Sequence, residues 1–385
     1  MKNRLVLGIM SGTSLDGVDY ALCAISSDAV RLRELWSVRF PTRLRQALHR
    51  AAAGWLPSHE LGQLHHDLGR FYALHARRPM SPDAVGLHGQ TVYHHPDPHA
   101  PGTLQIGEPA YLAEALRVPV VSNFRAPDIA AGGQGAPLAT MFHRLVFSRR
   151  GEAICVNNIG GISNVTALDW RRGSAPKVLA FDTGPGNMLI DLAMSHFTRG
   201  NHRLDRDGAW AARGKPSEAL LERWLRHPYF RNRPPKSTGR ELFGEPFFAR
   251  ILRDMRRLSL RDAVATLTEL TARSIAVNYR LHLPFAPKTI LLTGGGASNP
   301  TLVGAIARQF PDAVIQTCQS LGWPAQAIEP AAFALLAALR LESKPGNLPA
   351  TTGARHPALL GQISESWADA KSVQSRAANR SMKPQ

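Results

Sequence analysis

Two short segments rich in Gly, Ser and Thr have the composition of phosphate-binding turns. The first reads GIMSGTSLDGVD over residues 8–19, and the second reads NIGGISN over residues 158–164. Glycine lets a backbone approach a ligand closely, and successive backbone N–H groups can form a concave site for anions. Each segment alone is also compatible with an ordinary hairpin turn. Because both lie between strand-like runs, the pair favours a phosphate clamp.

Asp16 and Asp19 give the first turn two carboxylates. Mg²⁺ keeps several waters and takes one or two carboxylates, so these residues could hold it directly or through water. The segment is not a Walker P-loop, because no Gly-Lys-Ser/Thr follows its glycines. It is not a dinucleotide fingerprint either, because it leads into a strand-like run over residues 18–25 and not into a helix.

A further carboxylate, Asp182, stands in FDTGPGN, at the end of a strand-like run and before an amphipathic helix that starts at Met188. Such a carboxylate can act as a general base. Alternatively, it caps the turn or the start of the helix. Further on, TGGG at residues 293–296 follows another strand-like run. Its bare backbone could accept a nucleotide base or ribose, or it could be a plain strand–helix connection.

Two more segments carry polar residues that could contact a sugar. LHGQT contains His88 and Gln90, and NFRAPD contains Arg125, whose guanidinium can hold a carboxylate with two parallel hydrogen bonds. Arg125 could instead form a surface salt bridge with Asp128. The three histidines between residues 94 and 99 have neither a cysteine partner nor helical spacing, which argues against a metal site.

Strand-like and helix-like segments alternate along the chain, which predicts an α/β architecture. The strand–glycine turn–strand layout of residues 4–25 recurs over residues 153–168. This repeat predicts two lobes of similar build, each presenting one turn to a shared cleft. We expect an N-terminal lobe of residues 1–137, joined by residues 350–365, and a C-terminal lobe of residues 138–349.

The composition limits the functional classes. No apolar run approaches the roughly 20 residues of a spanning helix, and the first apolar run is too short for a secretory signal, so we expect a cytoplasmic protein with no membrane segment. The three cysteines are widely spaced and fit reduced core residues. The formal net charge of +17 favours anionic ligands, but the basic residues are scattered, so we expect no nucleic-acid partner. Residues 366–385 are polar and basic, which predicts disorder.

Nine segments, in order from about residue 5 to residue 355, resemble the anhydro-N-acetylmuramic acid kinase family. They are GIMSGTSLDGVD, LHGQTVYHHP, NFRAPDIAAGGQGAPLA, NNIGGISNVT, FDTGPGNMLID, LDRDGAWAARGK, PPKSTGRELF, LLTGGGASNP and GNLPATTGA. The resemblance implies the fold of the actin-like, sugar kinase and heat-shock ATPase superfamily, with two ribonuclease-H-like lobes and the active site in the cleft between them. It also implies an ATP-dependent enzyme that opens the 1,6-anhydro ring of its sugar with water and phosphorylates O6 during peptidoglycan recycling, and a homodimer.

The resemblance further implies a role for each matching residue. Asp182 matches the catalytic Asp and would deprotonate the attacking water. Glu329 would contact the sugar together with His88, Gln90 and Arg125, although it could simply favour the N-terminus of the helix that follows. ATP would bind, with Mg²⁺ on Asp16 and Asp19, at residues Gly12, Thr13, Ser14, Leu15, Asp16, Gly17, Val18, Asp19, Gly160, Gly161, Ser163, Gly294, Gly295 and Gly296.

Asn123 departs from the family pattern, in which an Asp often precedes the Phe-Arg pair. If that residue only braces Arg125, Asn can serve, whereas a contact with the sugar would be weakened. Three alternatives stay open: a kinase of the same superfamily that acts on an ordinary hydroxyl, a nucleotide-binding sensor with a degenerate site, and a nucleic-acid binder.

Overall fold

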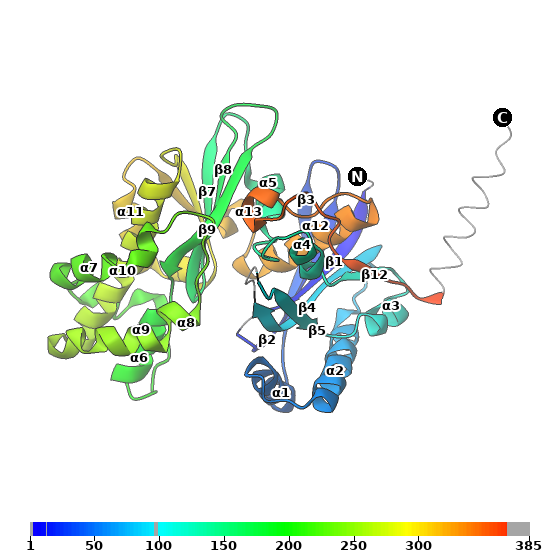
Figure 1. Cartoon of the computed structure of the whole chain (residues 1–385), viewed down its shortest axis with the longest axis horizontal. Coiled ribbons are helices and arrows are strands. Elements are labelled where there is room, and N and C mark those ends of the chain that lie inside the picture. The colour runs from blue at the N-terminus through cyan, green and yellow to red at the C-terminus, as the bar shows by residue number, and fades with distance from the viewer. Residues whose placement is uncertain (1–2, 13, 96–98, 368–385) are drawn as a thin grey trace. The chain divides into compact units, whose positions relative to one another are not determined.

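The computed structural model describes residues 3–12, 14–95 and 99–367, and it forms two compact units (Figure 1). The first unit runs from Met1 to Val146 and resumes at Gln326, and the second runs from Phe147 to Ala325. Of the tail expected to be disordered, residues 368–385 lie outside the described part. All three cysteines are buried and free, as predicted.

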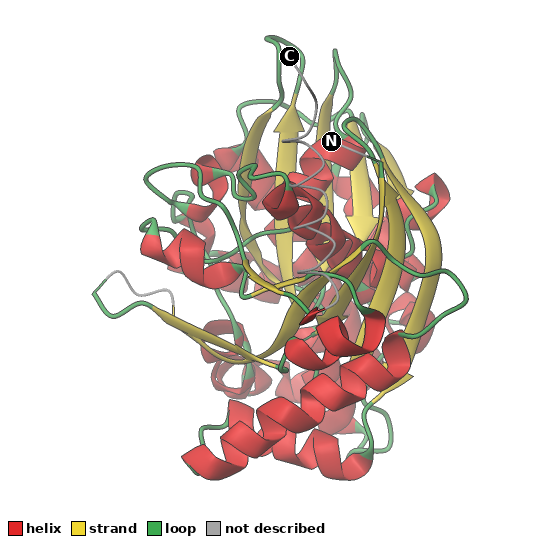
Figure 2. Ribbon diagram, turned by 90° about the vertical axis from the view of Figure 1, so that its right-hand side faces the viewer, coloured by secondary structure: helices red, strands yellow, loops and turns green. Residues whose placement is uncertain are grey.

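A seven-stranded mixed sheet forms the centre of the first unit, in the order β12-β6-β4-β1-β2-β3, with β5 paired to β4. Strands β1, β2 and β3 are successive antiparallel neighbours, and β4 and β6 continue the sheet parallel to β1. The strands are β1 (Arg4–Ser11), β2 (Gly17–Ile25), β3 (Val30–Arg39), β4 (Ala84–His95), β5 (Gly102–Ile106), β6 (Val120–Ser122) and β12 (Gln362–Ser364). The far end of β4 leaves the sheet with β5 as a two-stranded ribbon (Figure 2).

The second unit repeats this topology in a five-stranded sheet of order β11-β10-β7-β8-β9. Again three antiparallel strands come first, and two strands parallel to the first of them follow. The strands are β7 (Ala153–Ile159), β8 (Ile162–Asp169), β9 (Lys177–Pro185), β10 (Thr289–Thr293) and β11 (Val314–Thr317). The α/β class and the two ribonuclease-H-like lobes are therefore confirmed.

Helices cover both sheets within their own units. Those of the first unit are α1 (Thr42–Ala52), α2 (Ser58–Ala76), α3 (Ala110–Leu116), α4 (Arg125–Ala130), α5 (Thr140–Phe147), α12 (Ala325–Leu341) and α13 (Pro349–Thr352). Those of the second are α6 (Met188–Phe197), α7 (Glu218–Leu225), α8 (Arg240–Phe243), α9 (Glu245–Leu252), α10 (Leu260–His282) and α11 (Pro300–Gln309). Short 3-10 helices are η1 (Arg206–Gly208), η2 (Ala211–Arg213), η3 (Pro228–Arg231), η4 (Asp254–Arg257), η5 (Gly295–Ser298) and η6 (Cys318–Leu321).

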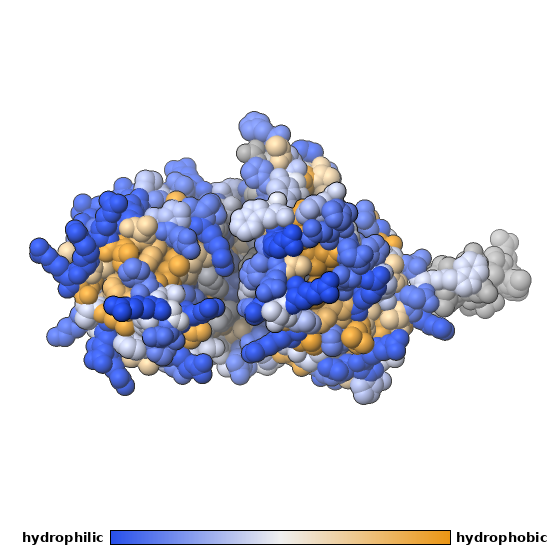
Figure 3. Space-filling model, turned by 90° about the horizontal axis from the view of Figure 1, so that it is seen from below, coloured by the Kyte–Doolittle hydropathy of each residue, from blue (hydrophilic) through white to orange (hydrophobic). Residues whose placement is uncertain are grey.

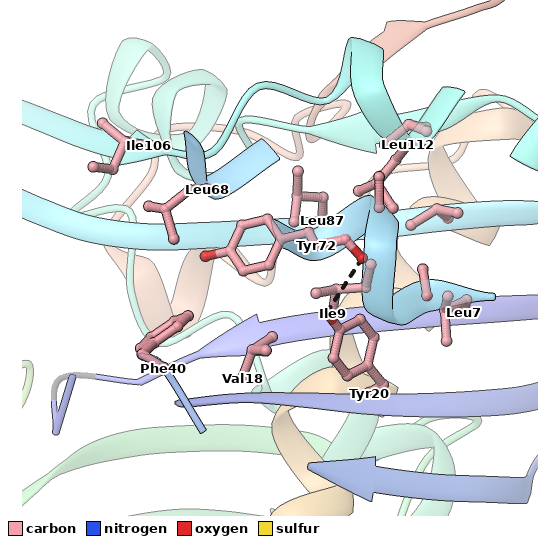
Figure 4. Packing of buried hydrophobic residues seen from close by; sticks show 14 of the residues in the cluster. Leu7, Ile9, Val18, Tyr20, Phe40, Leu68, Tyr72, Leu87, Ile106 and Leu112 are labelled. Atoms are coloured by element: carbon pink, nitrogen blue, oxygen red, sulfur yellow. Dashed lines mark hydrogen bonds between the residues drawn. The ribbon is translucent and has the colours of Figure 1, made fainter. Parts of the chain in front are cut away.

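The core of the first unit packs alternate residues of β1 and β2 against α2 (Figure 4). Tyr72 of α2 is fully buried, and its backbone oxygen accepts a hydrogen bond of 3.3 Å from the Tyr20 hydroxyl. The Tyr72 hydroxyl lies 2.7 Å from the Ser11 hydroxyl, at the end of β1. Each polar tip of these aromatic residues therefore has a partner in the core, and the start of the first glycine turn is tied to α2.

The second unit has an aromatic cluster beside α6 and α9 and a second cluster around α10, whose inner face is buried almost throughout. On the face drawn in Figure 3, hydrophilic side chains interrupt the hydrophobic ones on both units. Within the described part of the chain, no helix is both long and apolar enough to cross a membrane.

Helix α12 lies directly on β1 and β4 because two glycines leave room for its backbone. An added Cβ at Gly8 would stand 1.7 Å from the Pro330 carbonyl oxygen, and one at Gly86 would stand 2.2 Å from the Phe333 carbonyl oxygen. This close packing explains why α12 belongs to the first unit, although the sequence placed residues 138–349 in one lobe. Residues 138–146 likewise belong to the first unit.

We expect Gly8→Ala to destabilise the protein by at least about 2 kcal/mol, because the new methyl group forces α12 away from β1. Gly62→Ala is the matched control. Gly62 lies on α2, and its added Cβ would meet no atom within 4 Å, so a gain of about 0.5–1 kcal/mol is expected there. Urea unfolding of both variants measures the two changes, and equal stability of Gly8→Ala and the wild type would contradict the packing argument.

Candidate functional site

The first glycine turn joins β1 to β2, and its residues divide into two kinds. Leu15 and Val18 are buried in the core, and an added Cβ at Gly17 would stand 2.5 Å from the Val38 carbonyl oxygen, so the fold itself requires these three. Ser14 and Asp16 are exposed. Thr13 lies outside the described residues. Leu15, Gly17 and Val18 therefore pack the turn onto the core, and Ser14 and Asp16 remain accessible to a ligand.

Gln90 holds this turn in place. Its Nε2 donates to the Gly12 carbonyl oxygen at 3.1 Å, while its Oε1 is buried and has no hydrogen-bond partner among the described residues. The sequence predicted a contact with the sugar as the only role of Gln90. The structure gives it a bond to the first glycine turn, and it leaves an acceptor free for a donor.

Asp19, Arg125, His88 and Glu329 form one cluster in the first unit. Burial raises the pKa of Asp19, and a hydrogen bond from Ser37 opposes this rise. Desolvation of the carboxyl group raises the pKa of Glu329, which Arg125 counteracts and Asp19 reinforces, although the residue as a whole is exposed. The structure thus brings Asp19, from the strand after the first glycine turn, together with three of the residues expected to contact the sugar. Asp16 is exposed and Asp19 is half-buried, and one or two carboxylates are what Mg²⁺ takes when water fills its other positions.

Arg125 and His88 are hydrogen-bonded to each other. Arg125 Nε donates to His88 Nε2 at 3.1 Å, and His88 Nδ1 lies 2.8 Å from the Gly89 carbonyl oxygen. Burial and the Arg125 charge lower the pKa of His88, so the imidazole is neutral, with its proton on Nδ1. Asp128 forms no ion pair with Arg125 among the described contacts, so the surface salt bridge considered from the sequence is absent there. Asn123 has φ of 55°, a conformation that Asn and Asp both tolerate.

Asp182, near the end of β9, is held by residues that lie 47 to 56 positions further along the chain. Thr238 N donates to its Oδ2 at 2.8 Å, its own N donates to the Lys236 carbonyl oxygen at 3.1 Å, and the Tyr229 hydroxyl donates to its carbonyl oxygen at 2.9 Å. Burial and nearby Glu241 raise the pKa of Asp182 to about 6, against the lowering effects of the Thr238 N–H and Lys236. The result is a fixed carboxylate that is ionised at neutral pH and still basic.

Lys236 is itself fixed beside Asp182. Its Nζ donates to the Tyr229 carbonyl oxygen at 3.1 Å and lies 4.7 Å from the centre of the Tyr229 ring. Burial lowers the pKa of Lys236 to about 8, which the Asp182 charge opposes. Sequence reasoning missed Tyr229, Lys236 and Thr238 as residues around the carboxylate. The only signal was that PPKSTGRELF is one of the family-like segments.

The second glycine turn, between β7 and β8, packs against the start of α6. Backbone N–H groups of Gly186 and Met188 bond to the Gly161 carbonyl oxygen, and that of Asn187 bonds to the Gly160 carbonyl oxygen, at 2.8–3.1 Å. Since the C=O and N–H of one trans peptide point in opposite directions, the Gly161 N–H points away from α6. It has no partner within the described part of the chain, so it can serve an anion.

Ser163 lies in the interior. It is fully buried, and its hydroxyl accepts hydrogen bonds from Asn157 Nδ2 at 2.9 Å and from Thr183 Oγ1 at 2.8 Å. The third glycine run approaches the same turn, because an added Cβ at Gly294 would stand 2.7 Å from the Ile159 carbonyl oxygen. Asn187 Nδ2 also donates to that oxygen, at 3.2 Å. The structure thus brings the three glycine segments of the second unit together.

Several of these glycines have no role in packing. An added Cβ would meet nothing within 4 Å at Gly12, only Ile162 O at 3.5 Å at Gly160, and only Asn187 Nδ2 at 3.8 Å at Gly295. None of the three has a positive φ. Neither conformation nor packing within the described part of the chain therefore requires glycine there, and the bare backbone leaves room for a ligand to approach closely. Gly186, by contrast, would clash with the Gly160 carbonyl oxygen at 2.3 Å.

The family model for anhydro-N-acetylmuramic acid kinase matches residues 4–366 of this chain. Proteins named as this kinase from Cyanothece sp. (strain PCC 7425 / ATCC 29141) and from Acaryochloris marina are each 41% identical to it, over 93% of this chain and 98% and 99% of their own lengths. A ROK family glucokinase from Streptomyces griseus, solved with glucose and AMPPNP, has a TM-score of 0.41 at 13% identity and covers 87% of this chain and 99% of its own.

The raised pKa of Asp182 predicts a pH-dependent stability difference between the wild type and Asp182→Asn. In the folded wild type the pKa is about 6 instead of 3.8, so folding favours the protonated form. The protonated carboxyl group therefore costs the fold nothing below about pH 4, and the free energy of unfolding falls as the pH rises from about 4 to about 6. Asn does not titrate and can still accept from the Thr238 N–H. We expect Asp182→Asn to gain stability relative to the wild type between pH 4 and pH 7.

Asp262→Asn is a control of opposite sign. Hydrogen bonds from Lys215 N and Ser259 Oγ lower the pKa of Asp262, so its contribution is present at neutral pH and is lost on acidification. Unfolding curves at several pH values compare the three proteins. A constant difference between the wild type and Asp182→Asn would contradict the raised pKa.

Proposed function

The chain belongs to the anhydro-N-acetylmuramic acid kinase family, and we propose that it converts 1,6-anhydro-N-acetylmuramic acid, ATP and water into N-acetylmuramic acid 6-phosphate and ADP. The observation that carries the proposal is the Asp182 carboxylate, which is fixed by the Thr238 N–H and has a pKa raised to about 6. A base of this strength is ionised at pH 7 and can still accept a proton from water.

The proposed reaction couples two bond changes at one oxygen. Asp182 takes a proton from water as the water oxygen attacks C1 of the sugar, and the bond between C1 and O6 breaks. O6 forms a bond to the γ-phosphorus, and ADP leaves with the former bridging oxygen. Charge develops on the phosphoryl oxygens, where backbone N–H groups stabilise it without reorganisation.

ATP would lie against the glycine segments, with its phosphates at Gly12, Gly160 and Gly161. Open space beside Gly12 and Gly160 and the unpaired Gly161 N–H support this assignment. Gly294 to Gly296 would take the adenosine side. Mg²⁺ would supply charge neutralisation at the phosphates, held by Asp16 and Asp19 through water.

The sugar would lie at the cluster of Arg125, His88 and Glu329. Arg125 carries a half-buried positive charge suited to the lactyl carboxylate of the muramic acid, and Glu329 can accept hydrogen bonds from sugar hydroxyls. The free Oε1 of Gln90 would accept another. We further propose a homodimer, a cytoplasmic location and a role in peptidoglycan recycling. Light scattering during size-exclusion chromatography tests the dimer.

We expect the protein to consume ATP only when the anhydro sugar and Mg²⁺ are present, and oxygen-18 from labelled water to appear on C1 of the product. A coupled ADP assay and mass spectrometry measure these outcomes. Asp182→Asn should lower kcat by about a thousandfold while ATP still binds, because the base is lost. Faster turnover of plain N-acetylmuramic acid than of the anhydro form would instead indicate a kinase for an ordinary hydroxyl.

Gly160→Ala should weaken ATP binding by about tenfold or more, because the methyl group occupies the space in which a phosphate would contact the backbone. Its stability should be unchanged, since that methyl group meets only an ordinary contact at 3.5 Å. Gly62→Ala, on the surface of α2, should leave ATP affinity unaltered. Calorimetric titration with a non-hydrolysable ATP analogue measures the affinity of both variants. Wild-type affinity in Gly160→Ala would overturn the phosphate assignment for this turn.

A further inference from the structure

Asp128, on α4, is a buried carboxylate that the proposed chemistry does not use. Its exposed fraction is 0%, and no Lys or Arg side chain among the described residues is hydrogen-bonded to it. Instead it accepts three hydrogen bonds, from Gly135 N at 2.8 Å on Oδ2, and from Asn347 Nδ2 and Thr352 Oγ1, both at 2.7 Å, on Oδ1. Burial of a carboxylate is costly unless such bonds replace water, so its partners are specific.

Gly135 connects this carboxylate to Arg125. The Gly135 N–H bonds to Asp128, and the Gly135 carbonyl oxygen accepts from Arg125 Nη1 at 2.7 Å. Arg125 Nε donates to His88. Of the five N–H groups of a guanidinium, these bonds use two, and three remain without a partner in the described part of the chain. The guanidinium is therefore fixed in orientation and still able to bind an anion.

Two of the three partners of Asp128, Asn347 and Thr352, come from the family-like segment GNLPATTGA, to which no role was assigned above. Asn347 and Thr352 are 219 and 224 residues from Asp128 in the chain. The Asn347 side chain also accepts from Ala358 N at 2.7 Å, and the Thr352 carbonyl oxygen accepts from Gln134 N at 2.8 Å. The C-terminal segment thus closes over the loop that carries Gly135.

We propose that Asp128, Asn347 and Thr352 are positioning residues that set the affinity for the acidic sugar by fixing Gly135, and through it Arg125. The proposal rests on the proposed function, since it needs a ligand with a carboxylate at Arg125. A guanidinium held in advance loses little freedom on binding, which increases affinity. A segment that only stabilised the fold would leave the affinity for sugar unchanged.

Asp128→Asn and Thr352→Val test the proposal. All three partners of Asp128 are donors, so the NH₂ group of an Asn at this position must face another donor. Val at position 352 removes one donor and keeps nearly the same side-chain size. We expect both variants to bind the anhydro sugar about tenfold more weakly, with ATP affinity within about twofold of the wild type. Thr352→Ser keeps the hydroxyl and should restore binding. Calorimetry measures both ligands without requiring turnover.

A double-mutant cycle separates positioning from general stability. In an Arg125→Lys background, Thr352→Val should have little further effect on sugar affinity, because the group that it positions is gone. Leu48→Ala, in the core of the first unit, is the control: it should lower the unfolding temperature and leave sugar affinity unchanged. Equal effects of Thr352→Val in both backgrounds, or unchanged affinity in Thr352→Val, would overturn the proposal.

The experiment also distinguishes this proposal from the function on which it rests. If the wild type binds the sugar and does not turn it over, the proposed reaction is wrong and the affinities still test the positioning residues. If the wild type does not bind the sugar at all, both proposals fail.

Discussion

Contact between bare backbones is the interaction on which the rest of the structure depends. In the second unit, the carbonyl oxygens of Gly160 and Gly161 accept from the N–H groups of residues 186–188, where α6 begins, and Gly186 has no room for a side chain there. Because α6 begins a few residues after Asp182, these bonds fix the glycine turn and the carboxylate as one piece. In the first unit, Gly8 and Gly86 bring α12, which carries Glu329, against β1 and β4.

Glycine therefore serves two purposes in this protein: some glycines allow close packing within the fold, and others leave the backbone open to a ligand. Gly8, Gly86 and Gly186 are needed by the fold, whereas Gly12 and Gly160 are not. The carboxylates divide in a similar way. Hydrogen bonds lower the pKa of Asp262 and so stabilise its ionised form, whereas burial raises the pKa of Asp182 and so disfavours its ionised form. A group that is poorly solvated and yet ionised reduces stability, and this is the usual cost of a basic carboxylate in a site.

Local signals in the sequence were sufficient for the fold class and for the repeated strand–turn–strand unit, because both depend on hydrophobic runs and glycine turns. They were not sufficient for contacts between distant segments. Thr238 and Lys236 surround Asp182 from a loop, Thr352 reaches Asp128 across 224 residues, and α12 returns to the first sheet. Ser163 has the right type for a phosphate turn, but its place in the strand register turns its hydroxyl inward.

The two sheets share one strand order, and their cross-strand pairs can be compared. In the first unit Asp19 on β2 stands opposite Ser37 on β3, and in the second unit Asn164 on β8 stands opposite Asp182 on β9. The acid lies on the middle strand in one half and on the outer strand in the other. Under the proposed function, the acid on β2 serves a cation and the acid on β9 serves a proton, so equivalent positions of the two sheets carry different chemistry.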